Sequence, residues 1–365
     1  MENAEIMRIA THFDLSSEPI SAMPFGEGLI NSTFEINTAD GTRYIMQKIN
    51  TYVFKNPHGV MDNIQKVTDF LVDKIRMENR NPERETLQLI PTKSGKQFHH
   101  HPSDDTYWRV YNFILGATAH QTVEREGLLF EAAKAFGAFQ RQLSDFPAQT
   151  LCEVIPNFHN TAARYAAFEE ALRKDLAGHA DSVKEEIEFL QKHESYAHLI
   201  VDRLNDGRLP TRVTHNDTKL NNVLIDDITG KGICVIDLDT VMPGSLLYDF
   251  GDSVRFAANN GAEDDRDLSR VWIRPELYEE YVAGFLHGLN GCITEEEINL
   301  LPESVVVLTY ELALRFMTDY LDGDLYFKTL SKDHNLVRTR AQIQLVKDII
   351  SKLDLLHEIT EKYKK

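Results

Sequence analysis

The first third of the chain alternates between apolar and polar residues, which is the pattern of strands that bury one face. The alternation is clear from Ile30 to Ile36 and recurs in "RYIMQKIN" and "TYWRVYNFIL". Apolar residues from Val60 to Ile75 instead recur at spacings of three and four, which predicts one amphipathic helix. "ETLQLIPT" and "KQFHHH" add expected strands. We therefore predict a sheet of about five antiparallel strands with one inserted helix.

After residue 118 the pattern changes to that of helices, which we expect within "VEREGLLFEAAKAFGAFQRQL", over residues 161–179 and over residues 182–204. Thr294 and Glu297 form a capping-box pattern before a further long helical stretch. A short β island, "RVTHND", "NNVLID" and "GICVIDLD", interrupts the helices. The predicted fold class is α+β with two lobes, as in protein kinases. Residues 1–115 form a small β-rich lobe, with residues 1–20 as an extension or helix, and residues 116–365 form a large, mainly helical lobe.

Composition excludes some functional classes. The chain has 365 residues and a formal net charge of −18, which argues against nucleic acid or an anionic membrane as the main partner. Its three cysteines lie far apart and form no CxxC pair, so we expect reduced thiols and no zinc site. The N-terminus lacks the pattern of a signal peptide, and no apolar run is long enough to span a membrane. We expect a cytoplasmic protein, and the oligomeric state stays open.

Two polar segments of the β island carry the candidate chemistry. "THNDTKLNNVLID" places Asp217 and Asn222 five residues apart, just before a strand, and Asp237 closes the next strand in "VIDLDTVMPGS". Acidic residues at strand ends can hold a metal, act as acid or base, or cap turns. Phosphoryl transfer from ATP needs Mg²⁺ on oxygen ligands and an aspartate that deprotonates the acceptor hydroxyl. The spacing favours that chemistry. Gly26 and Gly28 lie where a phosphate-covering loop would, although in isolation a plain hairpin turn is the better explanation of the two glycines.

These motifs resemble the aminoglycoside phosphotransferase-like kinases. That pattern is His-x-Asp-x₄-Asn, then Ile-Asp, with Gly and Asp seven and twelve residues later, and the chain matches it at His215, Asp217, Asn222, Ile236, Asp237, Gly244 and Asp249. The resemblance implies that Asp217 is the catalytic base and that Asn222 and Asp237 bind Mg²⁺. It also implies that His215 and Asp249 brace the catalytic loop. ATP would contact Gly26, Gly28 and Gln47, and the backbone near Phe113 and Ile114.

A narrower resemblance, to bacterial N-acetylhexosamine 1-kinases, runs from about Gly26 to the "RAQIQLV" helix and rests on "RVTHNDTKLNNVLID", "IDLDTVMPGSLLYDFGDSVRF", "WRVYNFI" and "HNLVRTR". It implies transfer from ATP to the anomeric hydroxyl of N-acetylglucosamine (GlcNAc) or N-acetylgalactosamine (GalNAc). The residues expected to face the sugar are Asn31, Asp217, Phe256, Arg315 and Tyr326. By helical spacing alone, Arg315, Asp319 and Asp322 share one face, where they could bind a sugar or form a surface ion pair.

Two positions depart from these patterns. Gln47 stands where the broader family usually places a phosphate-binding lysine, and the neighbouring Lys48 should point to the opposite face of its strand. Leu29 stands where the narrower group carries histidine. The alternatives are a kinase of the same fold for another small alcohol, such as an amino alcohol, homoserine or an aminoglycoside, and a catalytically dead binding module. The intact motif set disfavours the binding module.

Overall fold

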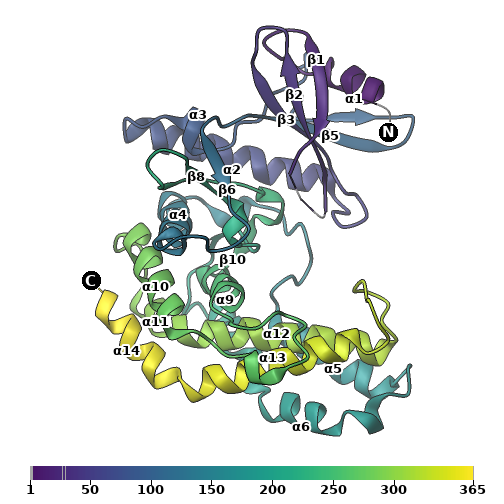
Figure 1. Cartoon of the computed structure of the whole chain (residues 1–365), viewed down its shortest axis with the longest axis vertical. Coiled ribbons are helices and arrows are strands. Elements are labelled where there is room, and N and C mark those ends of the chain that lie inside the picture. The colour runs from purple at the N-terminus through teal and green to yellow at the C-terminus, as the bar shows by residue number, and fades with distance from the viewer. Residues whose placement is uncertain (1–2, 27, 29, 365) are drawn as a thin grey trace. The chain divides into compact units, whose positions relative to one another are not determined.

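The computed structural model describes residues 3–26, 28 and 30–364, and the chain divides into two compact units (Figure 1). Unit 1 comprises Met1–Ala119, Asp145–Pro156 and Val223–Pro243, and unit 2 comprises His120–Ser144, Asn157–Asn222 and Gly244–Lys365. The sequence analysis divided the chain once, between residues 115 and 116. The structure differs because strand β6 (Ala117–Ala119) pairs with β8 (Val223–Asp226), which brings a distant segment into unit 1.

The main sheet of unit 1 has five strands in the order β1-β2-β3-β5-β4, all paired antiparallel, as predicted. The strands are β1 (Pro19–Pro24), β2 (Ser32–Thr38), β3 (Arg43–Lys48), β4 (His99–His101) and β5 (Thr106–Asn112). The predicted inserted helix is α2 (Pro57–Met77), followed by the short α3 (Pro82–Glu85). The prediction of a strand in "ETLQLIPT" is wrong. Only isolated bridges form there, and Pro91 removes a backbone donor from the segment.

The two faces of this sheet have different surroundings. On one face, helix α1 (Asn3–Ala10) packs Ile6 and Ile9 into an apolar cluster with Met46, Trp108 and Val110. Figure 1 shows α1 beside β1. Because successive residues of a strand point to opposite faces, Gln47 and Arg109 lie on the other face, while Lys48, paired with Trp108, lies on the α1 side. Gln47, which was predicted to contact ATP, therefore lies with Arg109 on the face away from α1.

The predicted β island is present. In unit 1, β8 pairs with β9 (Gly232–Val235) in a three-stranded sheet with β6, and β10 (Met242–Gly244) follows. In unit 2, β7 (Arg212–Thr214) leads into the His215–Asn222 loop. The tight hairpin between β8 and β9 places Asp237 just after the end of β9.

Unit 2 is mainly helical, as predicted. Its helices are α4 (Leu128–Gln142), α5 (Thr161–Lys174), α6 (Lys184–Lys192), α7 (Ser195–His198), α8 (Val201–Asn205), α9 (Leu246–Ala257), α10 (Pro275–Leu289), α11 (Glu295–Asn299), α12 (Leu301–Asp322), α13 (His334–Ser351) and α14 (Leu353–Tyr363). The helix expected over residues 182–204 is divided into α6, α7 and α8. The Thr294–Glu297 capping box forms and starts α11. None of the helices in the described residues combines the length and apolarity that a membrane crossing requires.

Close helix packing places the catalytic elements of unit 2. Helix α10 packs against α4 through glycines, and a Cβ atom on Gly284 would lie 2.2 Å from the carbonyl oxygen of Phe130. Only a residue without a side chain allows this approach. The packed α4 positions Gln140, and α9, which packs on α12, positions Asp249. Gln140 donates to the Asp249 carboxylate, which accepts in turn from the backbone of the loop after β7.

Candidate active site

The loop after β7 is anchored by one buried carboxylate. Asp249, which is 1% exposed, accepts hydrogen bonds from the backbone N–H groups of His215 (3.0 Å) and Asn216 (2.7 Å), and from the side chain of Gln140 (2.6 Å). Burial raises the pKa of this carboxyl, and the hydrogen bonds oppose that shift. The ring of His215 lies edge-on to Phe136 and Phe139 of α4. These contacts give His215 and Asp249 the positions expected of braces for the loop.

The backbone turns sharply before the proposed base. Asn216 has a positive φ of 64°, a left-handed conformation that residues other than glycine rarely adopt. Strained backbone of this kind persists where the surrounding structure imposes it, and it clusters at functional sites. Here the hydrogen bond from the Asn216 N–H to Asp249 holds the turn. It fixes the direction in which the next residue, Asp217, leaves the loop.

Asp217 is partly exposed and lies between two polar partners. The Asn222 side-chain amide donates to its backbone oxygen (2.7 Å) and to its carboxylate (3.2 Å). The Nζ atom of Lys219 lies 2.7 Å from the other carboxylate oxygen. Burial opposes the charge on Lys219, but Asp217 raises the pKa of the amine. The structure therefore brings Asp217 and Asn222 together, as the spacing predicted, and adds Lys219.

The donor set suits Mg²⁺, which prefers oxygen ligands from carboxylates and amides. In unit 2, Asn222 uses its amide nitrogen for Asp217, which leaves the amide oxygen to act as a ligand. In unit 1, Asp237 follows β9 and has a positive φ of 60°. Its backbone conformation is left-handed, like that of Asn216. The roles of Asn222 and Asp237 as metal ligands stay predictions.

On the face of the main sheet away from α1, a polar network contains Gln47. The Arg109 guanidinium donates twice to Gln47 Oε1, at 3.0 and 2.8 Å, and forms an ion pair with Asp239. Asp239 also accepts a 2.5 Å hydrogen bond from the Asn31 side chain. Asn31 was predicted to face the sugar, and its side-chain oxygen accepts from the backbone N–H of Asn50 (2.9 Å). In this structure both ends of the Asn31 amide are therefore bonded within unit 1.

The residues expected near the nucleotide base belong to the same unit. Phe113 packs edge-on against Phe25, with ring centroids 5.6 Å apart, and Arg43 stacks on its ring at 3.7 Å. Ile114 is buried next to it. Gly26 has a φ of 71°, which suits glycine in a tight turn. Gly28 is exposed, and Leu29, where the narrower group carries histidine, lies outside the described residues.

A cavity of about 220 Å³ lies in unit 2 and is lined by the helix face expected from the sequence. Arg315, Asp319 and Asp322 line it together with Arg164 and Tyr326. The hydrogen-bonding capacity of Asp319 is largely used within unit 2. Its carboxylate accepts from the backbone N–H of Tyr326 (2.7 Å) and of Phe327 (2.9 Å), and from the Asn335 side chain (2.8 Å). Asp319 therefore holds the segment that carries Tyr326.

The two aromatic residues predicted to face a sugar are both accessible. Tyr326 is 75% exposed and lines the 220 Å³ cavity. Phe256, near the end of α9, is 48% exposed. Large exposed aromatic side chains are available to stack on the apolar face of a ligand. Phe256 is not among the residues that line the cavity.

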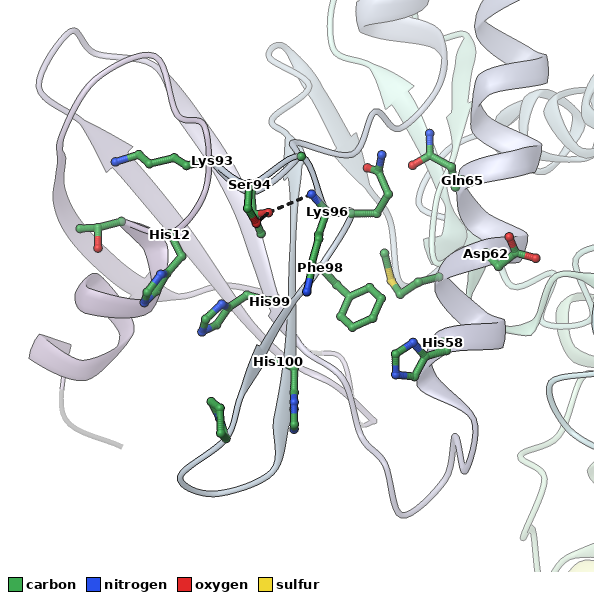
Figure 2. Close-up of a pocket in the computed structure, with 16 residues that line it drawn as sticks. His12, His58, Asp62, Gln65, Lys93, Ser94, Lys96, Phe98, His99 and His100 are labelled. Carbon is green, nitrogen blue, oxygen red and sulfur yellow. Dashed lines mark hydrogen bonds between the residues drawn. The ribbon is translucent and has the colours of Figure 1, made fainter.

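The histidine run 99–101 does not form one metal site. Figure 2 shows His99 beside His12, and the two rings stack with centroids 4.1 Å apart, while His100 stacks on Tyr107. His101 bonds Asp104 through Nδ1 (2.9 Å). The three rings thus have separate partners. His101 is buried, and His99 is half-buried beside the groove of about 970 Å³ in Figure 2.

Three basic residues of these sites were missed in the sequence analysis. Lys219 lies two residues after Asp217, so the loop spacing could have indicated it. Arg109 is part of the quoted "WRVYNFI", but its partner Asp239 is 130 residues away in sequence. Arg164, on α5, joins Arg315 only through helix packing.

Comparison with known families decides the classification. The model of the phosphotransferase enzyme family matches residues 21–289, which is most of the chain. The chain belongs to the phosphotransferase enzyme family. The match includes the Asp217 loop, Asp237 and Asp249. It ends before α12, so the 220 Å³ cavity lies largely outside the matched residues.

Solved structures of other phosphotransferases share the fold over nearly the whole chain. An aminopropanol kinase associated with a microcompartment matches with a TM-score of 0.63 and 17% identity, covering 96% of this chain and 98% of that one. A choline kinase from Cryptosporidium parvum matches with a TM-score of 0.60 and 13% identity, covering 99% of each. A spectinomycin phosphotransferase in complex with ADP and spectinomycin matches with a TM-score of 0.58 and 13% identity, covering 97% and 99%. These matches confirm the bilobal kinase-like fold.

Proposed function

We propose that this phosphotransferase uses ATP and Mg²⁺ to phosphorylate the anomeric hydroxyl of N-acetylhexosamines, giving the sugar 1-phosphate. The observation that carries the choice of acceptor is the composition of the 220 Å³ cavity. Two arginines and two aspartates line it, and the carboxylate of Asp319 already accepts three hydrogen bonds within unit 2. Such a mixed set can bind the hydroxyl and amide groups of a neutral sugar.

The chemistry of the reaction assigns a role to each loop residue. The anomeric oxygen attacks the γ-phosphorus, the bond to the β-phosphate oxygen breaks, and ADP leaves. Asp217 accepts the proton of the attacking hydroxyl, and Asn222 orients the Asp217 carboxylate through its amide. Lys219 contacts the other carboxylate oxygen of Asp217 and helps to hold that side chain in place. Mg²⁺, held by Asn222 and Asp237, would supply positive charge to the phosphates when bound.

A cationic acceptor is the main alternative, since relatives of this fold include an aminopropanol kinase and a choline kinase. The net charge of −18 is compatible with it. A pocket for an ammonium group needs unopposed carboxylates or aromatic faces around the cation. Two guanidinium groups line the cavity here and balance the two carboxylates, so the cavity has no excess negative charge to attract a cation. The cavity therefore favours the sugar.

An acceptor panel tests the proposal. ATP consumption with Mg²⁺ is measured on GlcNAc, GalNAc, galactose, choline, homoserine and kanamycin, and phosphorus NMR identifies the product. We expect an anomeric phosphate from the N-acetylated sugars. Asp217→Asn should fold normally and lose about 10²- to 10⁴-fold in turnover, because the base is removed. Turnover on choline, homoserine or kanamycin alone would reject the sugar pocket, and near-normal activity of Asp217→Asn would reject the mechanism.

A further inference from the structure

The position that usually supplies the phosphate-binding cation of this fold is neutral here. Protein kinases place a lysine on their third strand, and an acidic residue of the following helix pairs with it. In this chain β3 presents Gln47 on the face away from α1. Lys48 lies on the α1 side, opposite Trp108 of the apolar cluster. Neither Gln47 nor Lys48 therefore offers a positive charge on the face where Gln47 lies.

Arg109 supplies a charge at that place from the neighbouring strand. Gln47 and Arg109 are direct cross-strand partners, so their side chains leave the same face of the sheet side by side. Both hydrogen bonds from the guanidinium to Gln47 Oε1 hold it beside the Gln47 side chain. Arg109 is 1% exposed, and in the described part of unit 1 it is the only lysine or arginine that is buried. The strand register thus puts one arginine where a lysine is missing.

The counterion of Arg109 comes from the segment after β9. Asp239, which is 3% exposed, forms the ion pair, and Asp237 lies near enough to act on the same guanidinium. Burial disfavours the charged arginine, but these carboxylates hold the pKa of Arg109 above its ordinary value. The ion pair of Arg109 does not involve helix α2, whose buried Asn63 donates to the carbonyl oxygens of Val241 and Cys152. The cation is therefore paired with the predicted metal-binding segment instead of with the helix.

The network also reaches the segment that follows the glycines. Asn31 donates to Asp239 and accepts from the backbone of Asn50, so it links the residues after Gly28 to the ion pair. A buried ion pair gains little net stability over apolar side chains of the same volume. The ion pair of Arg109 and Asp239 is therefore better explained by a function that requires a buried cation in a fixed orientation than by stability.

We propose that Arg109 binds the phosphates of ATP in place of the β3 lysine, with Asp239 as its counterion and Gln47 as its positioning residue. The proposal rests on the ATP dependence in the proposed function. A planar guanidinium with five N–H donors suits phosphate oxygens, and the contacts with Gln47 and Asp239 together engage only part of this donor set.

The test measures binding of MgATP, MgADP and adenosine by calorimetry, with no acceptor present. Arg109→Gln should weaken MgATP and MgADP binding about 10- to 100-fold and leave adenosine binding unchanged, because only the phosphates lose a charged donor. Lys48→Gln is the matched control, and it should leave all three affinities unchanged. If Arg109→Gln is too unstable, Arg109→Gln/Asp239→Asn removes both charges together and should show the same selective loss.

Equal losses for MgATP and adenosine, no loss at all, or a selective loss in Lys48→Gln would each overturn the assignment. Because no acceptor is used, a wrong sugar assignment leaves this result intact. A folded wild-type protein that binds no nucleotide would instead overturn the ATP-dependent reaction and the role of Arg109 together.

Discussion

Two buried aspartates, one in each unit, are held in different ways. Asp249 in unit 2 is bonded by neutral donors, namely two backbone N–H groups and the amide of Gln140. Asp239 in unit 1 is bonded by a cation, Arg109, and by the amide of Asn31. A carboxylate bonded to backbone N–H groups fixes the chain at those residues. A carboxylate paired with an arginine holds a side-chain charge that a phosphate can also contact.

This difference separates a structural role from a binding role. The contacts of Asp249 set the conformation of the loop before Asp217, so its loss should disturb the reaction through geometry. The contacts of Asp239 orient Arg109, so its loss should disturb the charge available to the nucleotide. The two aspartates are nearly equal in burial, at 1% and 3% exposed, and differ mainly in the charge of their partners. Substitutions at each can therefore be compared directly.

The largest effect on stability is expected for Asp239→Ala. It leaves Arg109 buried without its partner, which should lower the free energy of unfolding by about 3–5 kcal/mol, measured by urea denaturation. Asp62→Ala, at an exposed ion pair of the same unit, is the control and should change it by less than about 1 kcal/mol. Adding Arg109→Met to Asp239→Ala should recover most of the loss, because no charge stays buried. If Asp239→Ala lowers the free energy of unfolding by less than Asp62→Ala does, the ion pair is not formed in solution.

Asp249→Asn should have a smaller effect on stability and a large one on turnover. The amide can accept with one oxygen only, so a buried N–H of His215 or Asn216 loses its acceptor, at about 1–3 kcal/mol. A displacement of Asp217 of about 1 Å can lower turnover about 100-fold. Urea denaturation and single-acceptor kinetics measure the two quantities. MgATP affinity should stay unchanged, and Asp354→Asn, exposed on α14, is the control. Selective loss of MgATP binding in Asp249→Asn would erase the distinction between the two aspartates.

The sequence could predict the elements and contacts that are local in the chain. The periodicity of residues 60–75 identified α2, the Thr294–Glu297 spacing identified a capping box, and the motif spacing brought Asp217 and Asn222 together. The network of Gln47, Arg109 and Asp239 depends on strand register and on a segment far away in sequence, which no local pattern encodes.

Asp319 shows a second limit of sequence reasoning. Its helical spacing correctly placed it on the face of Arg315, yet the spacing could not reveal that its carboxylate is bonded to the 326–327 backbone. An acidic residue that faces a cavity can be structural. Which carboxylates are available to a ligand follows only from their hydrogen bonds.

The smallest effect is expected for Gln140→Leu, which tests whether the neutral donors of Asp249 are equivalent. The substitution removes the 2.6 Å hydrogen bond from the amide but keeps both backbone N–H groups. It also removes the buried Oε1 atom of Gln140, which has no hydrogen-bond partner, so part of the loss is offset. We expect urea denaturation to show a loss of about 1 kcal/mol or less. Turnover should fall only severalfold, because the backbone contacts still hold the loop. A loss of turnover as large as that of Asp249→Asn would mean that the side-chain amide, and not the backbone N–H groups, fixes the position of Asp249.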